Sequence, residues 1–221
     1  MGSIGVGRRR FLAGAGLAVL AAGARAAGAE EQVAPGEDLM REHGVLRRVM
    51  LVYDEAVRRL EGRQPVPLDA VAGGAAIVRR VIEDYHEKLE EDFLFPRFEK
   101  AAKQLELVAV LRAQHQAGRG VTAEVLGLAK GPLRDEADRR QLAARLTAFN
   151  RMYRPHAARE DTVLFPAFHD LVGEKAYRAL GEQFEDRERQ VLGKEGFEGA
   201  VQEVAKLETA IGIHDLAKFT P

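Results

Sequence analysis

One short pattern occurs twice in this chain, and the repeat limits the possible fold more than any other feature. The segments are HEKLEEDFLFP, which begins at His86, and HAAREDTVLFP, which begins at His156. Each contains a histidine, a glutamate four residues later, an acid directly after it and a closing Leu-Phe-Pro. Residues four apart are neighbours on one face of an α-helix. Each segment therefore predicts a helix that presents an imidazole and a carboxylate side by side.

Both pairs lie on apolar helical faces. Residues at helical spacing around them are Val78, Ile82, Leu94, Phe149, Met152 and Leu164. Two further histidines, His43 and His115, lie among leucines in the same way, each on the preceding predicted helix. A lone histidine of this kind is usually a core residue with one hydrogen-bond partner, and a single His-x3-Glu is more often a surface pair. Here a lone histidine followed by a His-x3-Glu pair occurs twice in the same order. That repetition favours one site to which both halves of the chain contribute.

Helical spacing of apolar residues extends over most of residues 37–171 and predicts an all-α fold. We expect helices from about 37, 69, 104 and 135, separated by breaks at 62–67 and at Gly131-Pro132. The Leu-Phe-Pro tails are expected to pack and to end the second and fourth helices, with Pro96 near the end of the second helix or kinking it. Four such helices predict an up-down-up-down four-helix bundle. Residues 172–221 predict an extra C-terminal helical segment that packs on the bundle, with partner binding or dimerisation as the alternative.

The first 29 residues differ from the rest. Arg8-Arg9-Arg10 precedes Phe11-Leu12 and an apolar run rich in alanine and glycine, followed by Ala24-Arg25-Ala26. A charged start, a short apolar run and a small-residue cleavage site predict a signal peptide, since the run is short for a membrane span. The alternative is an uncleaved anchor. Arg-Arg-x-Phe-Leu resembles the twin-arginine signal. That resemblance implies the twin-arginine export machinery as a partner, a periplasmic or otherwise exported protein, and no stable membrane span after cleavage.

Composition narrows the chemistry. The chain of 221 residues has no cysteine and a net charge of −1. Disulfides, thiolate metal sites and a cysteine nucleophile are therefore excluded, and no basic excess points to nucleic acid. Six polar groups on core faces would be costly to bury unpaired. We therefore predict a dinuclear metal site built from these groups, namely His43, His86, Glu90, His115, His156 and Glu160.

Four imidazoles and two carboxylates suit two iron ions, with manganese or zinc as alternatives. If Glu90 and Glu160 each bridge the ions, each metal receives two histidine nitrogens and two carboxylate oxygens. Such coordination leaves positions open for a small ligand. Ferritin-like di-iron bundles use Glu-x-x-His and more carboxylates, so that class fits poorly.

The residue order resembles the hemerythrin-like family, also called HHE cation-binding domains. The family pattern is a lone histidine, His-x3-Glu, another lone histidine and a closing His-x3-Glu, and residues 37 to about 170 meet it. The resemblance implies a four-helix bundle with a non-haem di-iron centre and chemistry with O2, nitric oxide, peroxide or iron. Oxygen-carrying hemerythrins have a further histidine where this chain has Arg119, and their closing acid follows its histidine by five residues. These differences argue against reversible O2 carriage.

Residues next to the predicted ligands suggest further roles. Glu91 and Asp161 turn away from the glutamates that they follow, which indicates either outer partners of the site or surface acids. Arg119 or Glu87 could reach the metals, although a surface position is favoured for Glu87. Gly118 leaves room beside the metals. Two tyrosines, Tyr85 and Tyr153, are expected in the core, with donation to a metal-bound oxygen as the alternative.

Three functional hypotheses remain. The first is an exported di-iron protein that binds O2, NO or iron for sensing, scavenging, delivery or storage. The second is a di-iron oxidoreductase that acts on peroxide or nitric oxide. The third is a metal-free or zinc-bound structural bundle. Binding is favoured over autonomous catalysis, because no recognisable flavin or haem site would supply electrons.

Overall fold

The computed structural model describes residues 33–220, which are almost entirely helical and contain no strand. The all-α prediction is therefore confirmed. The predicted signal peptide at residues 1–29 lies outside the described residues. None of the described helices is both long enough and apolar enough to cross a membrane.

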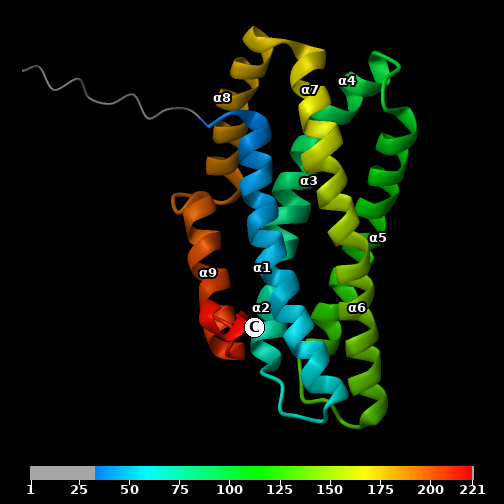
Figure 1. Ribbon diagram of the computed structural model, residues 1–221, viewed down its shortest axis with the longest axis vertical. Helices are drawn as coiled ribbons and strands as arrows, with labels where there is room; N and C mark the ends of the chain where they lie inside the picture. The colour runs from blue at the N-terminus through cyan, green and yellow to red at the C-terminus, as the bar shows by residue number, and fades with distance from the viewer. Residues whose placement is uncertain (1–32, 221) are drawn as a thin grey trace, which may run out of the picture. The chain divides into compact units, whose positions relative to one another are not determined.

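Four long antiparallel helices form the bundle (Figure 1). The first is α1 (Pro35–Glu61), and the third is α5 (Leu105–Ala129). The second helix runs unbroken through α2 (Leu68–Ile77), η1 (Val78–His86), α3 (Glu87–Leu89), η2 (Glu90–Leu94) and α4 (Phe95–Lys100). The fourth runs through α6 (Glu136–Arg159), η3 (Glu160–Leu164) and α7 (Phe165–Val172).

Local sequence explains where these helices begin and turn. Pro35 opens α1, where its missing N–H costs no hydrogen bond. The Asp135 carboxylate caps α6 by accepting from the backbone N–H groups of Ala137 and Asp138, at 2.8 and 3.0 Å. The turn before α5 places Gln104 at a φ of 51°. These signals fix the short connections that make neighbouring helices antiparallel.

Each repeated segment contains a π-helical stretch, which sequence patterning did not predict. The stretches η2 and η3 begin at Glu90 and Glu160 and end just before the Phe-Pro pairs. A proline cannot donate to the carbonyl four residues earlier and its ring crowds that carbonyl, and the wider π turn relieves both problems. The Leu-Phe-Pro tails therefore do not end their helices, which continue to Lys100 and Val172, although Pro96 does lie near the end of the second helix.

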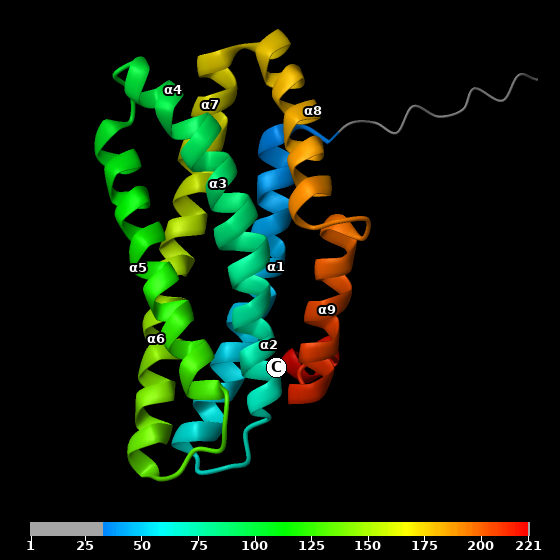
Figure 2. The same ribbon diagram turned by 180° about the vertical axis from the view of Figure 1, so that it is seen from behind.

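The C-terminal segment packs on the bundle. It consists of α8 (Glu174–Val191), α9 (Gly196–Ile211) and the short 3-10 turn η4 (Leu216–Phe219). Helix α8 runs beside the first half of α1, and α9 lies against α1 and α2 (Figures 1 and 2). Leu180, Phe184 and Val204 are fully enclosed in this packing. Burying such side chains stabilises the fold by about 1.5–3 kcal/mol each.

A polar layer separates two apolar cores within the bundle. One core contains Leu46, Ile82 and Val125, and the other contains Leu39, Leu89 and Leu111. Along α1, His43 lies between Leu39 of one core and Leu46 of the other. The second helix changes core between Ile82 and Leu89, α5 between Leu111 and Val125, and the fourth helix between Tyr153 and Leu164; these intervals contain His86, His115 and His156. The four histidines therefore occupy one level of the bundle.

Candidate metal centre

The four histidines of this layer form two pairs, one from each helical hairpin. His43 of α1 and His86 of η1 have ring centroids 4.6 Å apart. His115 of α5 and His156 of α6 have centroids 5.1 Å apart. Each pair brings two imidazole nitrogens close enough together to serve one cation.

The two glutamates lie between the histidine pairs, and each divides its oxygens between them. The Glu90 Oε1 lies 3.8 Å from His86 Nε2, and its Oε2 lies 3.3 Å from His115 Nε2. The Glu160 Oε2 lies 3.3 Å from His43 Nε2, and its Oε1 lies 3.0 Å from His156 Nε2. A carboxylate placed in this way can bridge two ions, one at each histidine pair.

All six side chains are buried, and several of their polar atoms have no hydrogen-bond partner. The unpartnered atoms are both carboxylate oxygens of Glu90, both of Glu160, and Nε2 of His86 and His115. Leaving a buried acceptor or donor unpaired costs about 1–3 kcal/mol, and more for a charged group. Two groups of buried residues have ligand atoms close enough together to hold a metal ion. One group contains Glu90, His115, His156 and Glu160, and the other contains His43, His86 and Glu160, so Glu160 belongs to both. The cluster therefore has the ligand types of a cation site, and its inward-facing atoms lack the hydrogen-bond partners that would otherwise satisfy them.

Proton affinities in the cluster are strongly perturbed. Burial lowers the pKa of His86 to about 4. Burial also acts to lower the pKa of His115, but Glu90 and Glu91 outweigh it and raise that pKa to about 10. Burial, followed by repulsion from Glu160, raises the pKa of Glu90. Burial and mutual charge therefore set the proton affinities in the cluster, and a cation would compete with protons for the same atoms.

An outer partner receives the proton of each imidazole Nδ1. His43 donates to Asp161 at 2.6 Å, His86 to Glu42 at 2.6 Å, His115 to Glu91 at 3.1 Å and His156 to Gln114 at 2.8 Å. Such bonds fix the tautomer and leave Nε2 as the free lone pair. Every Nε2 faces the central glutamates. The histidines are thus oriented as a set of inward-facing ligating groups.

The outer partners follow the internal repeat. The acids Glu91 and Asp161, which follow the two central glutamates, each bind the lone histidine of the other hairpin. Glu42 and Gln114, which precede the lone histidines, each bind the second histidine of their own hairpin. Sequence reasoning missed Glu42 and Gln114. The signal that could have found them is their shared place in the repeat, one residue before His43 and His115.

The phenylalanines of the two Leu-Phe-Pro tails pack on the lone histidines. Phe95 stacks on His115 with ring centroids 5.5 Å apart, and Phe165 stacks on His43 at 5.6 Å. Each tail therefore holds an imidazole of the opposite hairpin in place. This packing is the structural use of the repeated tail.

Glu87 is buried, so the expectation of a surface position is wrong. Its Oε1 accepts a hydrogen bond of 2.7 Å from the Tyr153 hydroxyl, and its Oε2 lies 2.8 Å from Arg119 Nη2. Arg119 also donates to Glu91 at 2.7 Å. Burial raises the pKa of Glu87 to about 7. Arg119 thus links a buried acid to the outer partner of His115, and Tyr153 donates within the chain.

The room left by Gly118 is filled by Tyr153 and does not open beside the cluster. A Cβ at Gly118 would overlap the Tyr153 hydroxyl, whereas one at Gly120 would meet nothing within 4 Å. We expect Gly118→Ala to lower the free energy of unfolding by about 1–3 kcal/mol, because Tyr153 must leave Glu87 or the helices must part. Gly120→Ala, in the same helix, should raise it by about 0.5–1 kcal/mol through helix propensity. Urea unfolding of both variants checks this; shifts of the same sign would contradict it.

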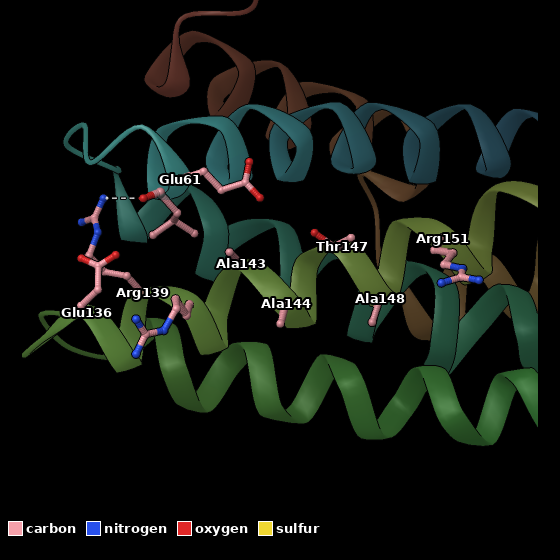
Figure 3. Close-up of a pocket in the computed structure, with 10 residues that line it drawn as sticks. Glu61, Glu136, Arg139, Ala143, Ala144, Thr147, Ala148 and Arg151 are labelled. Carbon is pink, nitrogen blue, oxygen red and sulfur yellow. Dashed lines mark hydrogen bonds between the residues drawn. The ribbon is translucent and has the colours of Figure 1, made fainter.

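A cleft elsewhere on the bundle is unrelated to the cluster. It has a volume of about 470 Å³ and lies between the end of α1 and the exposed face of α6 (Figure 3). Arg139 donates across it to the Leu60 carbonyl at 3.1 Å. Ala144 and Ala148 are among its lining residues, and none of the six cluster residues lines it.

An all-helical bundle with a buried layer of histidines and glutamates has the features of a metal-binding protein. The chain matches the hemerythrin HHE cation binding domain over residues 34–168 and belongs to that family. It is 46% identical over 193 residues to the uncharacterized proteins Rv1995 of Mycobacterium tuberculosis and Mb2018 of Mycobacterium bovis. The match covers 87% of this chain and 76% of each relative. No solved structure matches the chain.

Proposed function

We propose that this protein is a di-iron binding protein that takes up a small molecule such as O2 or NO, or handles iron itself. The proposed metal ligands are His43, His86, Glu90, His115, His156 and Glu160. The observation that carries the proposal is the placement of the two glutamates. Each directs one oxygen to each histidine pair, and none of these four oxygens has a hydrogen-bond partner.

The donor set supports iron. Imidazole and carboxylate without thiolate suit iron, and manganese or zinc are the alternatives that share this preference. Two iron ions held between the hairpins would supply coordination positions for a small ligand, and they would supply redox chemistry. The chain contributes orientation, because each imidazole is held by its outer partner, and exclusion of water, because an apolar core lies on each side of the polar layer.

Anaerobic purification of chain expressed with iron, followed by metal analysis, tests the proposal. We expect about two iron ions per chain and an absorption spectrum that changes when O2 or NO is added. Fewer than about one iron or manganese ion per chain would overturn the dinuclear proposal. Turnover of peroxide or nitric oxide with an added reductant would instead assign the protein to the oxidoreductases. Zinc alone would favour the structural alternative.

We also propose that the chain is exported through the twin-arginine route to the periplasm or beyond. The support is the sequence Arg8-Arg9-Arg10-Phe11-Leu12 and the small residues that end the apolar run. Replacing all three arginines by lysine keeps the positive charge and should leave the full-length chain inside the cell. Fractionation of expressing cells measures this. Unchanged export of the lysine variant would assign a different route.

A further inference from the structure

The twofold repeat of the outer partners fails at one position. Glu42 and Gln114 are equivalent in the repeat, yet His86 pairs with a carboxyl group and His156 pairs with an amide. A carboxylate partner strengthens an imidazole as a metal ligand more than an amide does. The two sides of the cluster are therefore chemically different, and the His156 side is the weaker donor.

A groove reaches the cluster at this same place. It has a volume of about 340 Å³ and runs between α5 and α6. Its lining residues are Leu107, Val110, Leu111 and Pro155, together with Gln114, His156 and the exposed Glu106 and Arg159. His156 is 4% exposed, whereas His115 is 0% exposed and His43 and His86 are each 1% exposed. The groove thus meets the most accessible imidazole of the layer.

We propose that a small uncharged molecule of the O2 or NO class reaches the metals through this groove, on the side of His115 and His156. This inference rests on the proposed function. The apolar lining offers no stabilisation to an anion, which would lose hydration on the way in. Glu106 and Arg159 carry opposite charges, so they supply no net field that would draw in a charged ligand.

Closing the groove with an indole ring tests the path. Val110 is 52% exposed, so Val110→Trp fills the groove from the surface without disturbing the core. Leu107→Trp is a second closing variant. The matched control is Ala144→Trp, which places the same ring in the cleft away from the cluster. We expect equal iron content in all three variants and an NO association rate that falls about tenfold in the groove variants alone.

A second measurement uses the metal-free protein. The chain has no tryptophan, so each variant carries a single indole that can be excited selectively at wavelengths where the four tyrosines do not absorb. The indole of Val110→Trp should be quenched by dissolved O2 but less by iodide than that of Ala144→Trp. Equal iodide quenching, or NO rates equal to the control in iron-loaded variants, would overturn the groove path and leave the di-iron proposal standing. A wild-type chain that takes up no iron would overturn both.

Discussion

A chain in which His86 and His156 are both replaced by alanine should fold and contain no iron. The two substitutions remove one imidazole from each histidine pair, and they leave each central glutamate with only the lone histidine of the opposite hairpin beside it. Neither half of the cluster would then retain two nitrogen ligands. Metal analysis after expression with iron gives the result directly. Full iron content in this variant would show that other residues hold the metal.

The matched control removes two histidines outside the layer. His169 pairs with Glu174 at the surface, and His214 is exposed, so His169→Ala with His214→Ala should leave iron content unchanged. The two variants should also differ in thermal stability. An ion present at 100 times its dissociation constant stabilises the folded state by about 2.7 kcal/mol, and only the control retains that increment. Equal melting temperatures with excess iron would contradict the expectation.

Arg119→Ala should destabilise the metal-free protein. It leaves Glu87 without its cation and removes a donor from Glu91. Removing one partner of a buried ion pair costs about 3–5 kcal/mol; because Arg119 remains partly exposed, we expect ~2–3 kcal/mol. Urea unfolding of the metal-free protein measures the loss. The outer bond of His115 to Glu91 should also weaken, which would lower iron affinity.

Two comparisons separate this effect from a general loss of charge. Arg112→Ala removes an arginine from the same helix, but Arg112 pairs with Glu99 at the surface and should cost less than about 1 kcal/mol. Adding Glu87→Gln to Arg119→Ala removes the stranded charge and should recover part of the stability. Equal losses in Arg112→Ala and Arg119→Ala would show that burial of Glu87 does not matter.

The fold could be predicted from the sequence because the apolar spacing and the breaks agree along four helices. The lone histidines His43 and His115 placed the repeated pairs in a common core. Glu42 and Gln114 could not be assigned in the same way, because a polar residue on the flank of a helix is normally solvated. Their role depends on which neighbouring helix lies beside them. Only the packing of the helices shows which neighbouring side chain each of them binds.

Two other departures have local physical causes. Glu87 follows His86 directly, and its polarity suggested solvent, but Tyr153 and Arg119 enclose it from the neighbouring helices. The repeated Leu-Phe-Pro tails were expected to end helices, and they do not, because a π turn before each proline accommodates its ring. Periodicity of apolar residues carries no information about either effect.

The contacts between the hairpins have a consequence for assembly. Each hairpin supplies a complete histidine pair, while its glutamate, its outer acid and its stacking phenylalanine each contact the other hairpin. A single hairpin therefore carries one of each type of component, but the site is complete only when two hairpins pack together. Formation of the site and docking of the two halves of the bundle are thus the same event.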